Sequence, residues 1–252
     1  MLTDVQQAAQ TRLQQLLANK FVDKLTEGID FVVGELAVEG GFLDDPLVRI
    51  LLPPPLGLVI DVARDINADP QAALLETLMN RAAENAIPVA GPILKEVLVN
   101  TDTETLQELL NSPRTAASAY LEEKGGAVIR EALLPGLARN LEANGAVELY
   151  GDLLSAHHEA NVAATAVETA AGDVAVVDSV APEQLSTYVA EQAMGGLFKK
   201  MAVKEMAIRD SLDRMVESPA VKLEIPLRTE FLAWHSAPAN QAWLAGRPGR
   251  SL

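Results

Sequence analysis

The sequence predicts an all-α protein, a single irregular multi-helix bundle with kinked and proline-capped helices. Of its 252 residues, 49% are hydrophobic but only 4% are aromatic. An interior made of Ala, Leu, Val and Ile is typical of closely packed helices rather than of a sheet sandwich. Apolar residues recur at helical spacing, and most of the fourteen prolines stand at expected helix starts and breaks.

The first half of the chain divides at glycines and prolines. A helix is expected from Thr3 or Asp4 to about Glu39, where Gly40-Gly41 ends it. A loop with an extended proline-rich arm and a helix over residues 56–66 follow. The next helix begins at Asp69, a cap residue, and Pro70, and Pro88 is expected to break it before it resumes toward residue 99.

Cap and breaker residues also place the later helices. Helices are expected over residues 104–110, capped by Asp102, and over residues 114–123, closed by Gly125-Gly126. Pro135 interrupts another over residues 128–141, Gly145 precedes one that reaches residue 154, and Pro182 opens a long helix toward residue 216. Residues 156–171 indicate an exposed or loosely packed helix, and residues 174–180 a linker or edge piece. Residues 1–217 are predicted to form one domain and residues 218–252 an extended or partly disordered tail.

Composition excludes several classes of function. The formal net charge of −15 repels a phosphate backbone, so we expect no nucleic-acid partner. No apolar run approaches the roughly 18 residues that cross a bilayer, so the chain is predicted not to span a membrane. The absence of cysteine excludes disulfides and thiolate sites. The compartment stays open: cytoplasmic if Met1 is the native start, periplasmic or envelope if a leader was removed.

One polar cluster stands on an otherwise core-like helix. Asn80, Arg81 and Glu84 lie among alanines, and Asn80 and Glu84 share a face. They are expected either to bind a ligand or to satisfy carbonyls freed by the break at Pro88. Late in the chain, Glu205 and Arg209 have the spacing of a helical ion pair, and Arg209 is expected to meet the central cluster. Tyr120 and Tyr188 are core or site residues.

Catalytic and metal signatures are weak. Adjacent histidines, His157 and His158, point about 100° apart on a helix and cannot chelate together. No nucleophile elbow or glycine-rich phosphate loop occurs in the sequence. We therefore predict no metal and no cofactor.

Several short elements carry a resemblance to a known family. Together they span about residues 16–215 and are Gly41-Phe42-Leu43, residues 79–84, Thr115-Ala116-Ala117 with Tyr120, Tyr188-Val189, Gly196-Leu197-Phe198, Glu205 and Ile208-Arg209. In these elements the chain resembles the bacterial domain-of-unknown-function 4197 family. The resemblance implies an all-helical domain, often exported to the envelope, with no established activity.

The sequence thus favours a non-enzymatic protein that binds a small apolar or amphipathic ligand or a protein partner. Its predicted ligand-binding residues are Asn80, Arg81, Glu84, Tyr120, Tyr188, Glu205 and Arg209. The alternative is a metal-independent hydrolase-type enzyme with Glu84 or Glu205 as acid or base. Oligomeric state is left open.

Overall fold

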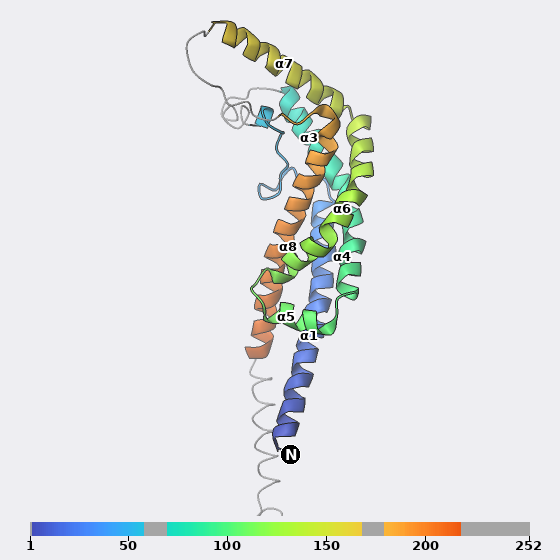
Figure 1. The fold of residues 1–252 in the computed structure, drawn as a ribbon, viewed down its shortest axis with the longest axis vertical. Helices are drawn as coiled ribbons and strands as arrows, with labels where there is room; N and C mark the ends of the chain where they lie inside the picture. Colours follow the sequence, from blue (N-terminus) through green and yellow to red (C-terminus); the bar gives the residue numbers. More distant parts are fainter. Residues whose placement is uncertain (1, 58–69, 168–178, 218–252) are drawn as a thin grey trace, which may run out of the picture. The chain divides into compact units, whose positions relative to one another are not determined.

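The computed structural model describes residues 2–57, 70–167 and 179–217, and the regular structure of these residues is helical. No strand occurs among these residues, so the predicted all-α class is confirmed. The elements, labelled in Figure 1 where there is room, are α1 (Leu2–Leu36), α3 (Pro70–Ala86), the 3₁₀ helix η2 (Ile87–Val89), α4 (Ala90–Val99), α5 (Thr103–Asn111), α6 (Ala116–Ala143), α7 (Ala146–Val167), the 3₁₀ helix η3 (Pro182–Gln184) and α8 (Leu185–Glu217).

The chain divides into two compact units, residues 1–206 and residues 207–252. In the first unit, α6 packs against α3 and α4, α1 packs against α4 and α5, and α7 packs against α3 (Figure 1). In the second, the end of α8 carries buried Ile208, Arg209 and Leu212. The predicted domain over residues 1–217 stays a prediction.

Local signals explain several helix ends. Pro70 is the first residue of α3, and the break predicted at Pro88 appears as the 3₁₀ turn η2 between α3 and α4. The carboxylate of Asp102 accepts a hydrogen bond of 2.9 Å from the amide of Thr105, which confirms it as the N-cap of α5. Gly145, in the left-handed region at φ 79°, separates α6 from α7.

The prediction that Gly125-Gly126 ends a helix is wrong. Helix α6 runs without interruption through both glycines and through Pro135. Gly125 and Gly126 are buried, and a Cβ atom on Gly125 would lie 3.4 Å from Cδ2 of Leu94 and 3.5 Å from Cγ2 of Val97 on α4. The glycines therefore allow α4 to approach α6 closely, and this packing outweighs the weak helix propensity of glycine.

Leucine, isoleucine and valine side chains dominate the core, as the composition predicts. Fully buried examples come from every long helix of the first unit: Phe21, Leu25, Ile29, Leu75, Met79, Leu94, Leu121, Ile129, Leu137, Tyr150, Leu185, Val189 and Leu197. Most of the helix predicted over residues 56–66, most of the linker predicted over residues 174–180 and the predicted tail lie outside the described residues.

Candidate functional site

Three polar side chains on one face of α3 hold the segment between α1 and α3. Glu76, Asn80 and Glu84 follow each other at intervals of four residues and are all buried. Each is bonded to a residue of the segment 37–57, in which residues 37–55 form turns and irregular structure without a helix. We call these three residues the loop clamp.

Asn80 is the centre of the loop clamp. Its Oδ1 accepts a hydrogen bond of 2.9 Å from the amide of Ile50, and its Nδ2 donates to the carbonyl of Ile50 at 2.8 Å. A further bond of 2.7 Å joins Nδ2 to the carbonyl of Glu76. Ile50 is buried and lies in no helix, so its backbone amide and carbonyl need partners, and Asn80 supplies both.

The ends of the loop clamp use charge. Oε1 of Glu84 accepts hydrogen bonds from the amides of Phe42 at 3.2 Å and Leu43 at 3.4 Å, while its Oε2 accepts one of 3.0 Å from Arg81. Arg81 also pairs with Glu39. Glu76 pairs with Arg49. The central cluster thus meets backbone of residues 42–50 rather than carbonyls freed at Pro88.

The same segment is bonded from α8 as well. The hydroxyl of Tyr188 donates to the carbonyl of Leu51 at 3.1 Å, and burial raises the pKa of this tyrosine. Lys200 pairs with Asp45 at 2.7 Å, and the hydrogen bond to that carboxylate raises the pKa of the lysine. Gly196 on α8 lies so close to this segment that a Cβ atom on it would be 3.0 Å from Cε1 of Phe42. Segment 37–57 is therefore held from two helices.

Glu205 caps another helix. Its carboxylate accepts hydrogen bonds from the amides of Ala117 at 3.1 Å and Ser118 at 2.7 Å, and from the Ser118 hydroxyl at 2.7 Å. These are first-turn donors of α6, which have no partner inside their own helix. A negative group at a helix N-terminus is also favoured by the helix dipole. Glu205 therefore serves as an N-cap supplied from α8.

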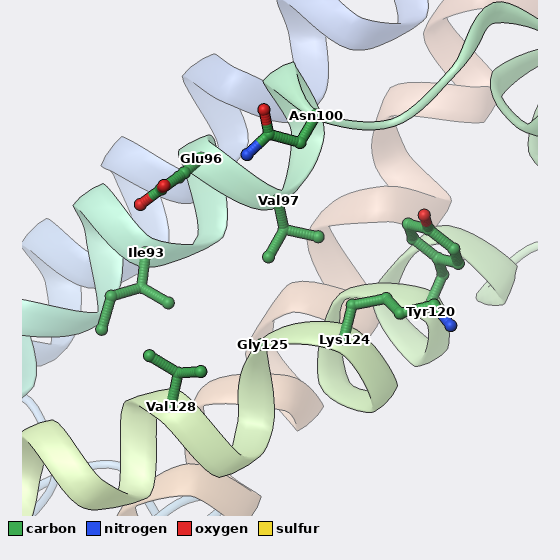
Figure 2. A pocket seen from close by; sticks show the side chains of 8 residues that line it. All are labelled: Ile93, Glu96, Val97, Asn100, Tyr120, Lys124, Gly125 and Val128. Carbon is green, nitrogen blue, oxygen red and sulfur yellow. The ribbon is translucent and has the colours of Figure 1, made fainter.

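A groove lies between α4 and α6, with a volume of about 410 Å³. Figure 2 shows Ile93 and Val97 projecting from α4 toward α6, and Val128 projecting from α6 toward α4. Glu96 on α4, Asn100 at the C-terminal end of α4, and Tyr120, Lys124 and Gly125 on α6 complete the lining (Figure 2). The groove thus combines an apolar middle with polar groups from both helices.

The polar groups from α6 are partly engaged with neighbours. Lys124 donates to Glu123 at 2.9 Å, which raises the pKa of the lysine, and its Nζ lies 5.8 Å from the centre of the Tyr120 ring. The hydroxyl of Tyr120 accepts a hydrogen bond of 3.3 Å from Thr101. Tyr120 is therefore oriented by contacts on both its ring and its hydroxyl.

Six of the seven predicted site residues lie at three places in the first unit. Asn80, Glu84 and Tyr188 form hydrogen bonds with segment 37–57, and Arg81 is bonded to Glu84. Glu205 caps α6, and Tyr120 lines the groove. Arg209 is buried but belongs to the second unit, so its predicted meeting with the central cluster stays a prediction. Ligand binding by all seven residues likewise stays a prediction.

Sequence reasoning missed two groups of residues. Glu76 carried a findable signal, since it lies one helical turn before Asn80 on the same face. Ser118, Ile93, Val97 and Val128 carried none, because serine and valine are ordinary on helices and their roles come from a second helix.

Within residues 2–57, 70–167 and 179–217, no group of three or more His, Asp or Glu residues is placed to hold a metal ion. None of the described helices has the length and apolar character that crossing a bilayer requires.

Comparison with known proteins gives one result. The family described as "Protein of unknown function (DUF4197)" matches residues 13–218, which is most of the chain. No curated protein and no solved structure matches significantly.

Proposed function

Because the chain belongs to the DUF4197 family, whose description names no activity, we propose a function from its geometry: a non-enzymatic protein that binds a small amphipathic molecule in the groove between α4 and α6. The observation that carries this proposal is the groove itself. Its volume of about 410 Å³ is within the range of small-molecule sites, about 300–1,000 Å³.

The lining of the groove supports an amphipathic ligand. Ile93, Val97 and Val128 offer apolar surface to a hydrocarbon chain or ring, and 53% of Val128 is exposed. Burial of such surface is favourable by about 25 cal/mol per Å². Glu96, Asn100 and Lys124 lie beside these residues and offer partners to a polar head group. A purely apolar ligand would leave those groups unused.

The hydrolase alternative has less support. Glu205 lies beside a hydroxyl, that of Ser118 at 2.7 Å, but the two residues are 0% and 3% exposed. A substrate could not reach this pair, and using the carboxylate as a base would break the cap of α6. Both oxygens of Glu84 also accept hydrogen bonds from protein groups. Neither carboxylate has the accessible, unoccupied oxygen that acid-base chemistry needs.

The test is a methyl NMR titration of the purified protein with 1-octanol, a neutral amphiphile that suits the groove. We expect shifts confined to the methyl groups of Ile93, Val97 and Val128 and their neighbours. Val128→Asp should remove the shifts, because a charge on the groove wall opposes hydrocarbon burial.

Val203→Asp is the matched control. Val203 is 51% exposed on α8, close to the 53% of Val128, and does not line the groove. This variant should bind 1-octanol like the unaltered protein. Shifts that are absent from the groove, or that survive Val128→Asp, would contradict the proposal; native mass spectrometry would then show whether a protein partner co-purifies instead.

A further inference from the structure

The charges around the groove are unequal in their availability. Lys124 is the only cation among the described residues that line the groove, and it donates to Glu123 at 2.9 Å, so a carboxylate lies against its ammonium group. Within the described residues, no hydrogen bond or ion pair engages the carboxylate of Glu96. The available charge on the lining is therefore negative.

Asn100, the C-cap of α4, follows Glu96 by four residues and lines the same groove (Figure 2). Its side-chain amide makes no hydrogen bond with another described residue, so its oxygen is available as a neutral acceptor. An exposed carboxylate and an amide oxygen one turn apart form a pair of acceptors at the edge of an apolar surface. A head group that donates several hydrogen bonds and carries positive charge complements this pair.

The charge of the whole chain acts in the same direction. At −15, it attracts small cations and repels small anions at long range. An anionic head group would have to approach Lys124 past its partner Glu123 and against this field. A neutral head group would gain nothing from this long-range field.

We infer that the groove selects cationic amphiphiles of the alkylammonium class. The ammonium group binds Glu96 and Asn100 on α4, and the hydrocarbon lies along Ile93, Val97 and Val128. This inference rests on the proposed function and specifies the ligand class of the same groove.

The experiment compares three probes with the same eight-carbon chain: octylammonium, 1-octanol and octanoate. An alkylamine resembles lysine, whose pKa is about 10.4, so it is positively charged at pH 7. Methyl shifts of Val97 and Val128 report binding of each probe. We expect octylammonium to bind at least about fivefold more tightly than octanoate, with a difference that shrinks in high salt.

Two variants locate the effect. Glu96→Gln should weaken octylammonium about two- to fivefold, the range of an exposed ion pair, and leave 1-octanol unchanged. Glu142→Gln is the matched control, because it removes the same formal charge from an exposed position outside the groove. It should leave octylammonium binding close to that of the unaltered protein.

The outcomes separate this inference from the proposed function. Equal binding of the three probes, or octanoate binding that is strongest and is lost in Lys124→Gln, would overturn the cationic preference and leave an amphiphile site in place. An equal loss in Glu96→Gln and Glu142→Gln would also overturn it, since only net charge would then matter. If none of the probes shifts the groove methyl groups, both proposals fail.

Discussion

The loop clamp and the groove use polar side chains in opposite ways. In the loop clamp, Asn80 and Glu84 are buried and bonded to backbone of the segment 37–57. In the groove, Glu96 is exposed, and Lys124 is half-exposed; its ammonium group pairs with Glu123 and lies over the Tyr120 ring, both on its own helix. The difference follows from the backbone: a segment without regular structure needs partners for its amides and carbonyls, whereas two packed helices satisfy their own.

This comparison teaches that a polar residue on an apolar helix is an ambiguous sign. The residues that stand out in the sequence of α3 are engaged in holding the fold, while the groove is formed by residues that do not stand out. Loss of a loop-clamp residue should therefore reduce stability, and loss of a groove residue should not.

The largest effect is expected for Asn80→Ala. The change leaves both backbone groups of Ile50 without their partner inside the protein, and a buried unpaired group costs about 1–3 kcal/mol. We expect the free energy of unfolding to fall by about 2 to 4 kcal/mol, measured by urea denaturation. Asn85→Ala, at an exposed position of the same helix, is the control and should stay within about 0.5 kcal/mol. Equal effects in the two variants would erase the distinction between the loop clamp and the surface.

A smaller effect on stability is expected where α8 contacts segment 37–57. A Cβ atom on Gly196 would lie 3.0 Å from Cε1 of Phe42 and 3.1 Å from Cβ of Val48, so Gly196→Ala should cost about 1 to 3 kcal/mol. A Cβ atom on the adjacent Gly195 meets no neighbouring atom within 4 Å. Gly195→Ala should therefore stabilise the protein by about 0.5 to 1 kcal/mol through helix propensity. Thermal unfolding of the two variants gives the sign of each; a shared sign would show that the close contact is not what selects glycine.

The smallest effect is expected in the groove. Lys124→Ala removes a half-exposed side chain whose ion pair joins adjacent residues, and such pairs contribute about 0–1 kcal/mol. The free energy of unfolding should change by less than about 0.5 kcal/mol. A loss as large as that of Asn80→Ala would place Lys124 among the residues that hold the fold and would weaken the comparison.

Local rules predicted much of the fold. Helical spacing and small side chains indicated the all-α class, and single residues such as Asp102 and Pro88 marked a helix start and a break correctly. The same rules failed at Gly125-Gly126 and Pro135, inside α6. Glycine and proline break helices by local preference, but the close approach of α4 to Gly125 is a tertiary effect that no local rule contains.

The candidate site was predictable only in part. Helical periodicity placed Asn80 and Glu84 on one face, but their partners Ile50 and Phe42 are 30 and 42 residues away, and nothing in a single sequence pairs them. Helical spacing predicted Arg209 as the partner of Glu205. It did not predict that the carboxylate of Glu205 caps α6, which lies far away in the sequence. Of the described residues that line the groove, Tyr120 was among the predicted site residues, but the apolar ones were not, because they differ in no way from core residues until two helices are placed side by side.

The cap of α6 has a consequence for the order in which the protein folds. Glu205 lies 88 residues after Ala117 and 87 residues after Ser118, so the start of α6 is synthesised long before its cap. On a growing chain, the first turn of α6 keeps its amides exposed to water until α8 has emerged at least as far as Glu205. Closing a chain segment of this length also carries an entropic penalty before the carboxylate reaches the amides. The N-terminal end of α6 is therefore among the last parts of the first unit to become ordered, although it stands near the middle of the sequence.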